Sequence, residues 1–110
     1  MATARMRRVN KVMLEVIGAA IGEELHDPRI GFVTVTAVET SPDLRSARVH
    51  VSVLGSDDEK EATLEALRAS RVVLQKVIAT QLTMKRTPTL SFHYDDSVER
   101  ADRLTRMLDS

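Results

Sequence analysis

The hydrophobic period of this chain changes abruptly at Pro28, from the spacing of a helix to that of a strand. Before Pro28, apolar residues recur at steps of three and four, which places them on one face of a helix. The helix should end before Asp27, because the residue preceding a proline is pushed out of the α region. After Gly31 the apolar residues alternate, as in a half-buried strand. The predicted apolar face of the helix comprises Val9, Val12, Met13, Val16, Ile17, Ala20, Ile21 and Leu25.

Strand alternation recurs in two later segments. A turn over residues 41–43, Ser-Pro-Asp, separates the first two strands and predicts an antiparallel hairpin. A third strand follows Pro88. The side chains expected to face inward are Val33, Val35 and Ala37, then Ala47, Val49, Val51 and Val53, and finally Leu90, Phe92 and Tyr94.

Helical spacing fills the rest of the chain. Ser56 and Glu59 have the spacing of a capping box. The helix that follows would extend to Leu82, which is long for a small domain, so a bend or break is expected near Ser70. Ser97 is expected to cap a last short helix. The order α-β-β-α-α-β-α predicts an α+β fold over residues 1–110, as one domain with helices on one face of a three-stranded sheet. Every element is expected to bury its aliphatic side in this arrangement, including the last helix, whose apolar positions are Val98, Ala101, Leu104 and Leu108.

Composition excludes several classes of chemistry. The chain has no cysteine, so disulfides and thiolate chemistry are absent. No apolar run approaches the ~20 residues that span a bilayer, and the first residues lack a signal-peptide pattern, so a cytoplasmic protein without membrane contact is expected. The histidines lack metal-ligand spacing and the glycines form no phosphate-binding loop. We therefore expect no enzyme, no cofactor, no metal and no small-molecule substrate.

Two acidic motifs remain as alternatives. His26 and Asp27 are neighbours, but they are more simply explained as a polar loop. Asp95 and Asp96 could form a catalytic or metal-binding carboxylate pair, as in a small hydrolase, or could end a strand before a helix N-terminus.

Formal net charge is zero, with 16 basic and 16 acidic residues, yet the cations gather in acid-free segments. Such segments can form a positive face, or simply a solvated surface. The few aromatic residues, all expected in the core, leave no stacking platform, so an RNA-binding protein of this kind would read backbone and shape. The candidate RNA-binding residues are Arg5, Arg7, Arg8 and Lys11 in one patch, Arg71, Lys76, Lys85 and Arg86 in a second, and Arg29, which could instead anchor Asp27.

Three motifs then add what periodicity cannot. Residues 26–35, HDPRIGFVTV, resemble the DPR-(I/L)-G helix-to-strand junction of the ribosome-binding factor A family. Residues 38–51 resemble that family's V-x-x-S-x-D-L-x-x-A-x-V run, and residues 88–97 its P-x-L-x-F-x-x-D-x-S signature. The three motifs occur in order across nearly the whole chain.

The resemblance implies a type II KH-like fold and association with the free 30S subunit during maturation of its 16S rRNA, including processing of the 5′ end. It also implies an Ala-x-Gly kink between two helices, where this chain has Ser70-Arg71-Val72. The family's Arg after the kink is Gln75 here. We expect a non-catalytic, monomeric assembly factor. The alternative is a protein-interaction module that contacts ribosomal or RNA-processing proteins without binding RNA.

Overall fold

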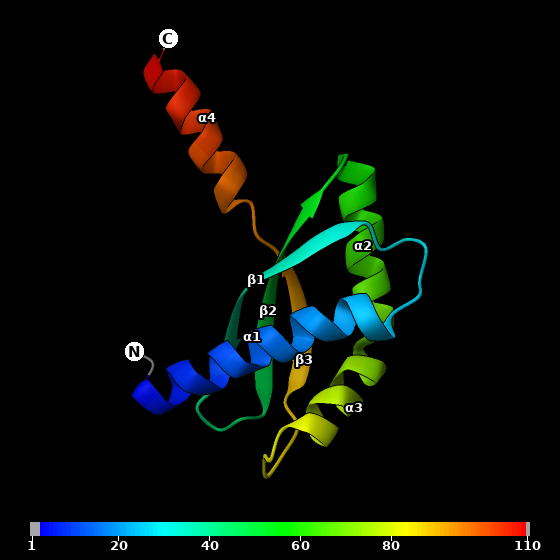
Figure 1. The fold of residues 1–110 in the computed structure, drawn as a ribbon. Coiled ribbons are helices and arrows are strands. Elements are labelled where there is room, and N and C mark those ends of the chain that lie inside the picture. The colour runs from blue at the N-terminus through cyan, green and yellow to red at the C-terminus, as the bar shows by residue number, and fades with distance from the viewer. Residues whose placement is uncertain (1–2, 110) are drawn as a thin grey trace.

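The computed structural model describes residues 3–109, and its elements follow the predicted order (Figure 1). The N-terminal helix is long, and the second helical region is divided into two helices. The elements are α1 (Ala4–Glu24), β1 (Phe32–Thr40), β2 (Ser46–Leu54), α2 (Asp57–Ala69), α3 (Arg71–Gln81), β3 (Thr89–Tyr94) and α4 (Ser97–Asp109).

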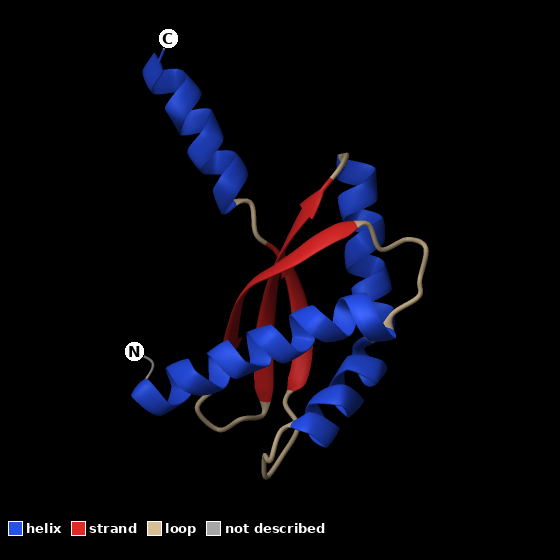
Figure 2. Ribbon diagram, in the orientation of Figure 1, coloured by secondary structure: helices blue, strands red, loops and turns tan. Residues whose placement is uncertain are grey.

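The three strands form one sheet in the order β1-β2-β3, with β1 antiparallel and β3 parallel to the central β2. Helix α1 crosses the strands and packs against α3, whereas α2 packs against β2 and β3 (Figure 2). The inward-facing residues of β2 pack with these helices in one apolar core, as predicted, and within residues 3–109 no helix lies over the opposite face of the sheet. Fully buried members include Met13, Ile17, Ala47, Val49, Val51, Leu67, Leu74 and Leu90.

The alternation predicted for β1 is wrong beyond Val35. The register with β2 shifts between Val35 and Ala37, so the strand contains a bulge at Thr36. One extra residue reverses the face of all that follow. Val38 and Thr40 are therefore buried, and Ala37, which was expected inward, pairs with His50 instead.

The break predicted near Ser70 is confirmed. Helix α2 ends at Ala69 and α3 begins at Arg71, and the Ser70 N–H donates to the carbonyls of Ala66 and Leu67. The predicted capping box at the start of α2 is also present, with Ser56 and Glu59 bonded reciprocally.

The expected cap of the last helix is wrong by one position. Ser97 is the first residue of α4, and its N–H donates to the Asp95 carboxylate at 2.9 Å. The Arg100 N–H donates to the Asp96 carbonyl. The two carboxylates therefore belong to the junction between β3 and α4, as the structural alternative predicted.

The expectation that every element buries its apolar side is also wrong. Helix α4 extends away from the sheet (Figure 1), and residues 99–109 are all exposed, although the Glu99 carboxylate in its first turn pairs with Lys60 of α2 at 2.7 Å. Of the aromatic residues, only Phe92 is fully buried. Phe32 is 82% exposed, because it pairs with Leu54 at the end of the sheet on the face without helices. Val12, predicted in the core, is 41% exposed.

Candidate RNA-binding surface

The strand directions bring two loops together at one end of the sheet. Because β2 and β3 are parallel, their first residues Ser46 and Thr89 pair. The Thr89 N–H also donates to the Arg45 carbonyl at 2.9 Å. The hairpin loop that carries Arg45 therefore adjoins the loop that carries Lys85 and Arg86. Arg45 was missed by the sequence reasoning, although its place just after the predicted turn was a usable signal.

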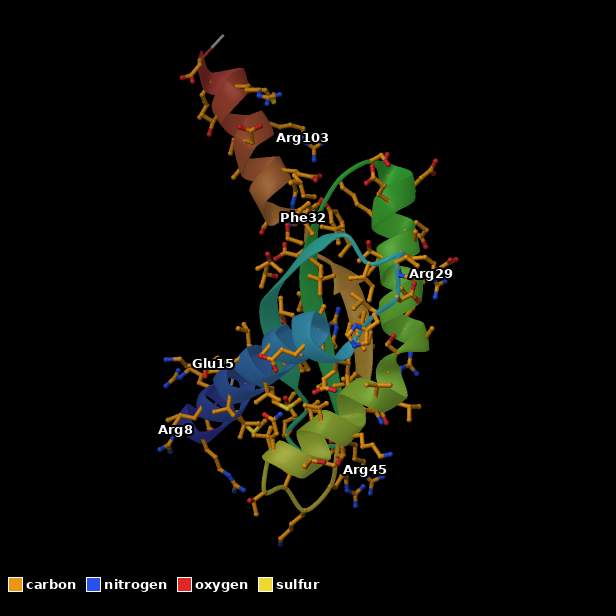
Figure 3. The ribbon with its side chains drawn as sticks, turned by 45° about the vertical axis from the view of Figure 1, so that its right-hand side comes forward. Arg8, Glu15, Arg29, Phe32, Arg45 and Arg103 are labelled. Atoms are coloured by element: carbon orange, nitrogen blue, oxygen red, sulfur yellow. The ribbon has the colours of Figure 1, made fainter. Side chains whose placement is uncertain are left out.

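The first half of α1 reaches the same end of the sheet. The Asn10 side-chain oxygen accepts a hydrogen bond from the N–H of Thr40, the last residue of β1, at 2.9 Å. Arg8 and Val12 line a hollow together with Met84, which precedes the loop cations. Figure 3 shows Arg8 and Arg45 toward this end and Phe32 and Arg103 toward the other. The first predicted patch thus lies beside half of the second. We call this surface the basic end, comprising Arg5, Arg7, Arg8, Lys11, Arg45, Lys85 and Arg86.

Six of these seven cations have no carboxylate partner within the described residues 3–109. Elsewhere arginines form short ion pairs, such as Arg100 with Asp96 at 2.9 Å and Arg106 with Asp102 at 2.8 Å. At the basic end, only Arg45 has a described carboxylate within 4.0 Å, that of Asp43 at 3.7 Å. The structure gives no such ion pair to Arg5, Arg7, Arg8, Lys11, Lys85 or Arg86. Cations without internal partners are the ones available to bind phosphate.

The remaining members of the second patch lie on α3. Arg71 is the first residue of α3 and Gln81 is the last. The rise per residue of an α-helix places these two residues about 15 Å apart. Its side chain is half-buried, and its Nε atom is buried without a hydrogen-bond partner among the described residues. Lys76, in the middle of α3, is exposed. The structure therefore extends the cationic surface along α3 but does not gather these two residues at the basic end.

Arg29 anchors Asp27, which was the structural alternative for this residue. Its guanidinium donates from Nη2 to Oδ2 of Asp27 at 2.7 Å and from Nε to Oδ1 at 3.1 Å. These hydrogen bonds lower the pKa of the Asp27 carboxyl. The buried Thr63 hydroxyl donates to the Arg29 carbonyl and accepts from the Gly31 N–H, which ties the loop to α2. The DPRIG motif thus shapes the connection between α1 and β1.

The carboxylates considered as catalytic or metal-binding groups form hydrogen bonds within the fold. The Asp27 carboxylate is engaged by Arg29, and the Asp95 carboxylate accepts from Thr36 and Ser97. In the part of the chain that the structure describes, no three His, Cys, Asp or Glu side chains are arranged to hold a metal ion. Over the same residues, no helix is long and apolar enough to cross a membrane.

The α-β-β-α-α-β order, with its break between α2 and α3, defines a small KH-like α+β domain. A family model described as ribosome-binding factor A matches residues 5–108. A curated ribosome-binding factor A of Thermomicrobium roseum is 44% identical over 108 residues, which cover 98% of this chain and 84% of the relative. The chain belongs to the ribosome-binding factor A family.

Solved structures agree with this assignment. A solution NMR structure of a Thermotoga maritima ribosome binding factor A is similar with a TM-score of 0.78 and 31% identity, covering 90% of this chain and 94% of that one. The crystal structure of ribosome-binding factor A from Thermus thermophilus gives a TM-score of 0.74 and 27% identity, covering 81% and 93%. A Thermus thermophilus homology model fitted into a cryo-EM map of a 30S complex gives 0.66 and 28%, covering 79% and 91%.

Proposed function

We propose that this protein is a non-catalytic assembly factor that binds the free 30S subunit in the cytoplasm and assists late maturation of 16S rRNA, including processing at the 5′ end. The whole chain acts as one ribosome-binding domain and binds as a monomer. The observation that carries the proposal is the basic end, where the fold gathers seven cations, six of which have no carboxylate partner among residues 3–109. Family membership supports it, as does the Thermus thermophilus relative that was fitted into a 30S complex.

The contacts we propose are to phosphate. Exposed arginine and lysine side chains neutralise phosphates and release counterions, so binding weakens as salt rises. Arg7 and Arg8 are neighbouring members of the basic end and serve as its test residues. The proposed primary contacts are Arg5, Arg7, Arg8, Lys11, Lys85 and Arg86, with Lys76, Arg71 and the Asp27-bound Arg29 as secondary contacts.

A protein without catalytic groups can still direct maturation. A ligand that binds one RNA conformation better than another shifts the population toward the first. The protein would hold the immature subunit in one arrangement while other enzymes process the RNA. The differential affinity, not bond making, is then the activity that a variant should change.

The experiment is co-sedimentation of the purified 110-residue chain with 30S subunits, 50S subunits and 70S ribosomes across a salt series. We expect selective pelleting with 30S that fades steeply as salt rises. The double variant Arg7→Gln with Arg8→Gln should flatten the slope of log affinity against log salt by about 1.4 to 1.8, the value for two lost phosphate contacts. The matched control is Arg100→Gln with Arg106→Gln, which removes two arginines already paired with aspartates.

Folded protein that fails to pellet with 30S at low salt would overturn the proposal. If the slope of log affinity against log salt were the same for the Arg7/Arg8 variant and its control, the basic end would not be part of the binding surface.

A protein-interaction module is the second candidate function, and the exposed apolar residues far from the basic end favour it. Phe32 and Leu54 form an exposed cross-strand pair, and Leu104 and Leu108 are exposed on α4. Exposed apolar patches often mark protein contacts. Binding to 30S with little salt dependence, abolished by Phe32→Ser, would favour this function over RNA-directed docking.

A further inference from the structure

The basic end contains an apolar hollow between α1 and the segment that follows α3. Its volume is about 240 Å³. Val12 is exposed because its side chain lines this hollow and not the core. A packed core would close such a space, so the hollow is a feature of the surface. Its lining residues are Arg8, Val9, Val12, Leu82, Thr83 and Met84.

One cation lines the hollow, and three more adjoin its lining residues along the chain. Arg8 belongs to its lining, and Lys11 precedes Val12 on the same helix. On the opposite side, Lys85 and Arg86 directly follow the lining residue Met84. None of these four cations has an ion-pair partner among residues 3–109. The charge complementary to these four cations is negative, whereas the mostly apolar lining is suited to a flat or apolar group.

A nucleotide combines these two properties. Its base has apolar faces, and each base is attached to a backbone that carries one negative charge per phosphate. In a duplex the bases are stacked and paired, but loops, bulges and ends offer bases that can leave the stack and enter a protein site. Aliphatic and methionine side chains adapt to such a ring.

We propose that the hollow accepts one unpaired nucleobase of the RNA, with the flanking phosphates held by Arg8, Lys11, Lys85 and Arg86. This inference rests on the proposed function and adds a class of ligand to it: an unpaired nucleotide rather than a duplex backbone alone. Thr83 is the one uncharged polar side chain among the described lining residues, so the site offers little to distinguish one base from another. The protein would therefore recognise that a nucleotide is unpaired more than which nucleotide it is.

The probes are two RNA hairpins that differ only in one bulged adenosine, and binding of the 110-residue chain to each is measured by fluorescence anisotropy across a salt series. We expect the bulged hairpin to bind about tenfold more tightly than the fully paired one, the order of effect that burying the apolar surface of one base against aliphatic side chains should give. Val12→Gln and Met84→Ser remove apolar lining without changing charge. Each should bring the ratio close to one and leave the salt slope unaltered. Val72→Gln is the matched control, since Val72 is exposed on α3 outside the hollow, and it should keep the ratio.

The outcomes separate this inference from the function on which it rests. Equal, steeply salt-dependent binding of both hairpins would overturn the nucleobase site and leave RNA-directed docking intact. No salt-dependent binding to either hairpin or to 30S would overturn both. If Val12→Gln lost pelleting with 30S but kept the preference for the bulge, the hollow would hold a protein segment, and the nucleobase inference would be wrong. Circular dichroism of each variant checks that it remains folded.

Discussion

Asp95 joins three elements of the fold, so removing its carboxylate should change both stability and the dependence of stability on pH. Oδ2 accepts from the Thr36 hydroxyl at 2.7 Å, and Oδ1 accepts from the Ser97 N–H at 2.9 Å. The Asp95 N–H donates to the Val51 carbonyl on the central strand. The hydrogen bond from Thr36 is the largest of the causes that lower the pKa of Asp95 to about 2.

The size of the effect follows from these two acceptor contacts. Asp95→Ala removes the acceptor at the start of α4, a loss of about 1 kcal/mol for a helix cap. It also removes the Thr36 contact, about 1 kcal/mol more, because the carboxylate is only half-buried. We therefore expect a loss of about 2 kcal/mol in the free energy of unfolding at neutral pH. A double-mutant cycle with Thr36→Val should give a coupling energy of about 1 kcal/mol, since Ser97 accounts for the rest.

The pH dependence has a definite sign. The folded pKa of Asp95 lies below the ordinary value of 3.8, so its stabilisation is present above that value and is lost as pH falls toward about 2. Urea unfolding followed by circular dichroism, at about pH 7 and about pH 3, measures this for the wild type and Asp95→Ala. The difference between them should shrink at the lower pH. An equal difference at both pH values, or a coupling energy near zero with Thr36→Val, would refute the reasoning.

Gly18→Ala and Gly22→Ala should each raise the free energy of unfolding by about 1 kcal/mol, because a Cβ at either position would meet nothing within 4 Å among the described residues. Gly55→Ala should lower it instead, since Gly55 has φ +146°; thermal unfolding that gave one sign for all three changes would contradict this. The Gln75 side-chain oxygen accepts from the Leu90 N–H at 3.2 Å, so Gln75→Arg should cost about 1 kcal/mol, whereas Gln75→Glu keeps an acceptor. Equal urea midpoints for these two variants would show that this hydrogen bond contributes nothing.

The alternating sequence pattern predicted correctly which side chains are buried in the central strand, which has a neighbouring strand on both sides. The four alternating residues of β2, from Ala47 to Val53, are all buried, because the central strand packs one full face on the helices. The same reasoning failed in β1, where the bulge at Thr36 adds one residue without any glycine to signal it. It failed again for Phe32 and for α4, because exposure depends on whether another element covers a side chain. Periodicity within a segment carries no information on that.

The candidate site was predictable in its parts but not in its assembly. The acid-free segments that contain Arg8 and Arg86 are visible in the sequence. Their meeting depends on the parallel pairing of β2 with β3 and on the hydrogen bond between Asn10 and Thr40, which no local pattern encodes. Arg29 shows the reverse case. Both of its alternatives were visible in the DPR motif, and the geometry of one side chain decided between them.

The strand directions also explain how a chain with no net charge can be oriented by RNA. The carboxylates of Asp57 and Asp58 lie in the first turn of α2, where their negative charge interacts favourably with the helix dipole. This turn follows the end of β2. Asp95 directly follows β3, which is parallel to β2, so these acids lie at the end of the sheet opposite Lys85 and Arg86. A phosphate surface attracts one end of such a domain and repels the other. The exposed Phe32 lies at the repelled end and would therefore face away from the RNA, available to a protein neighbour.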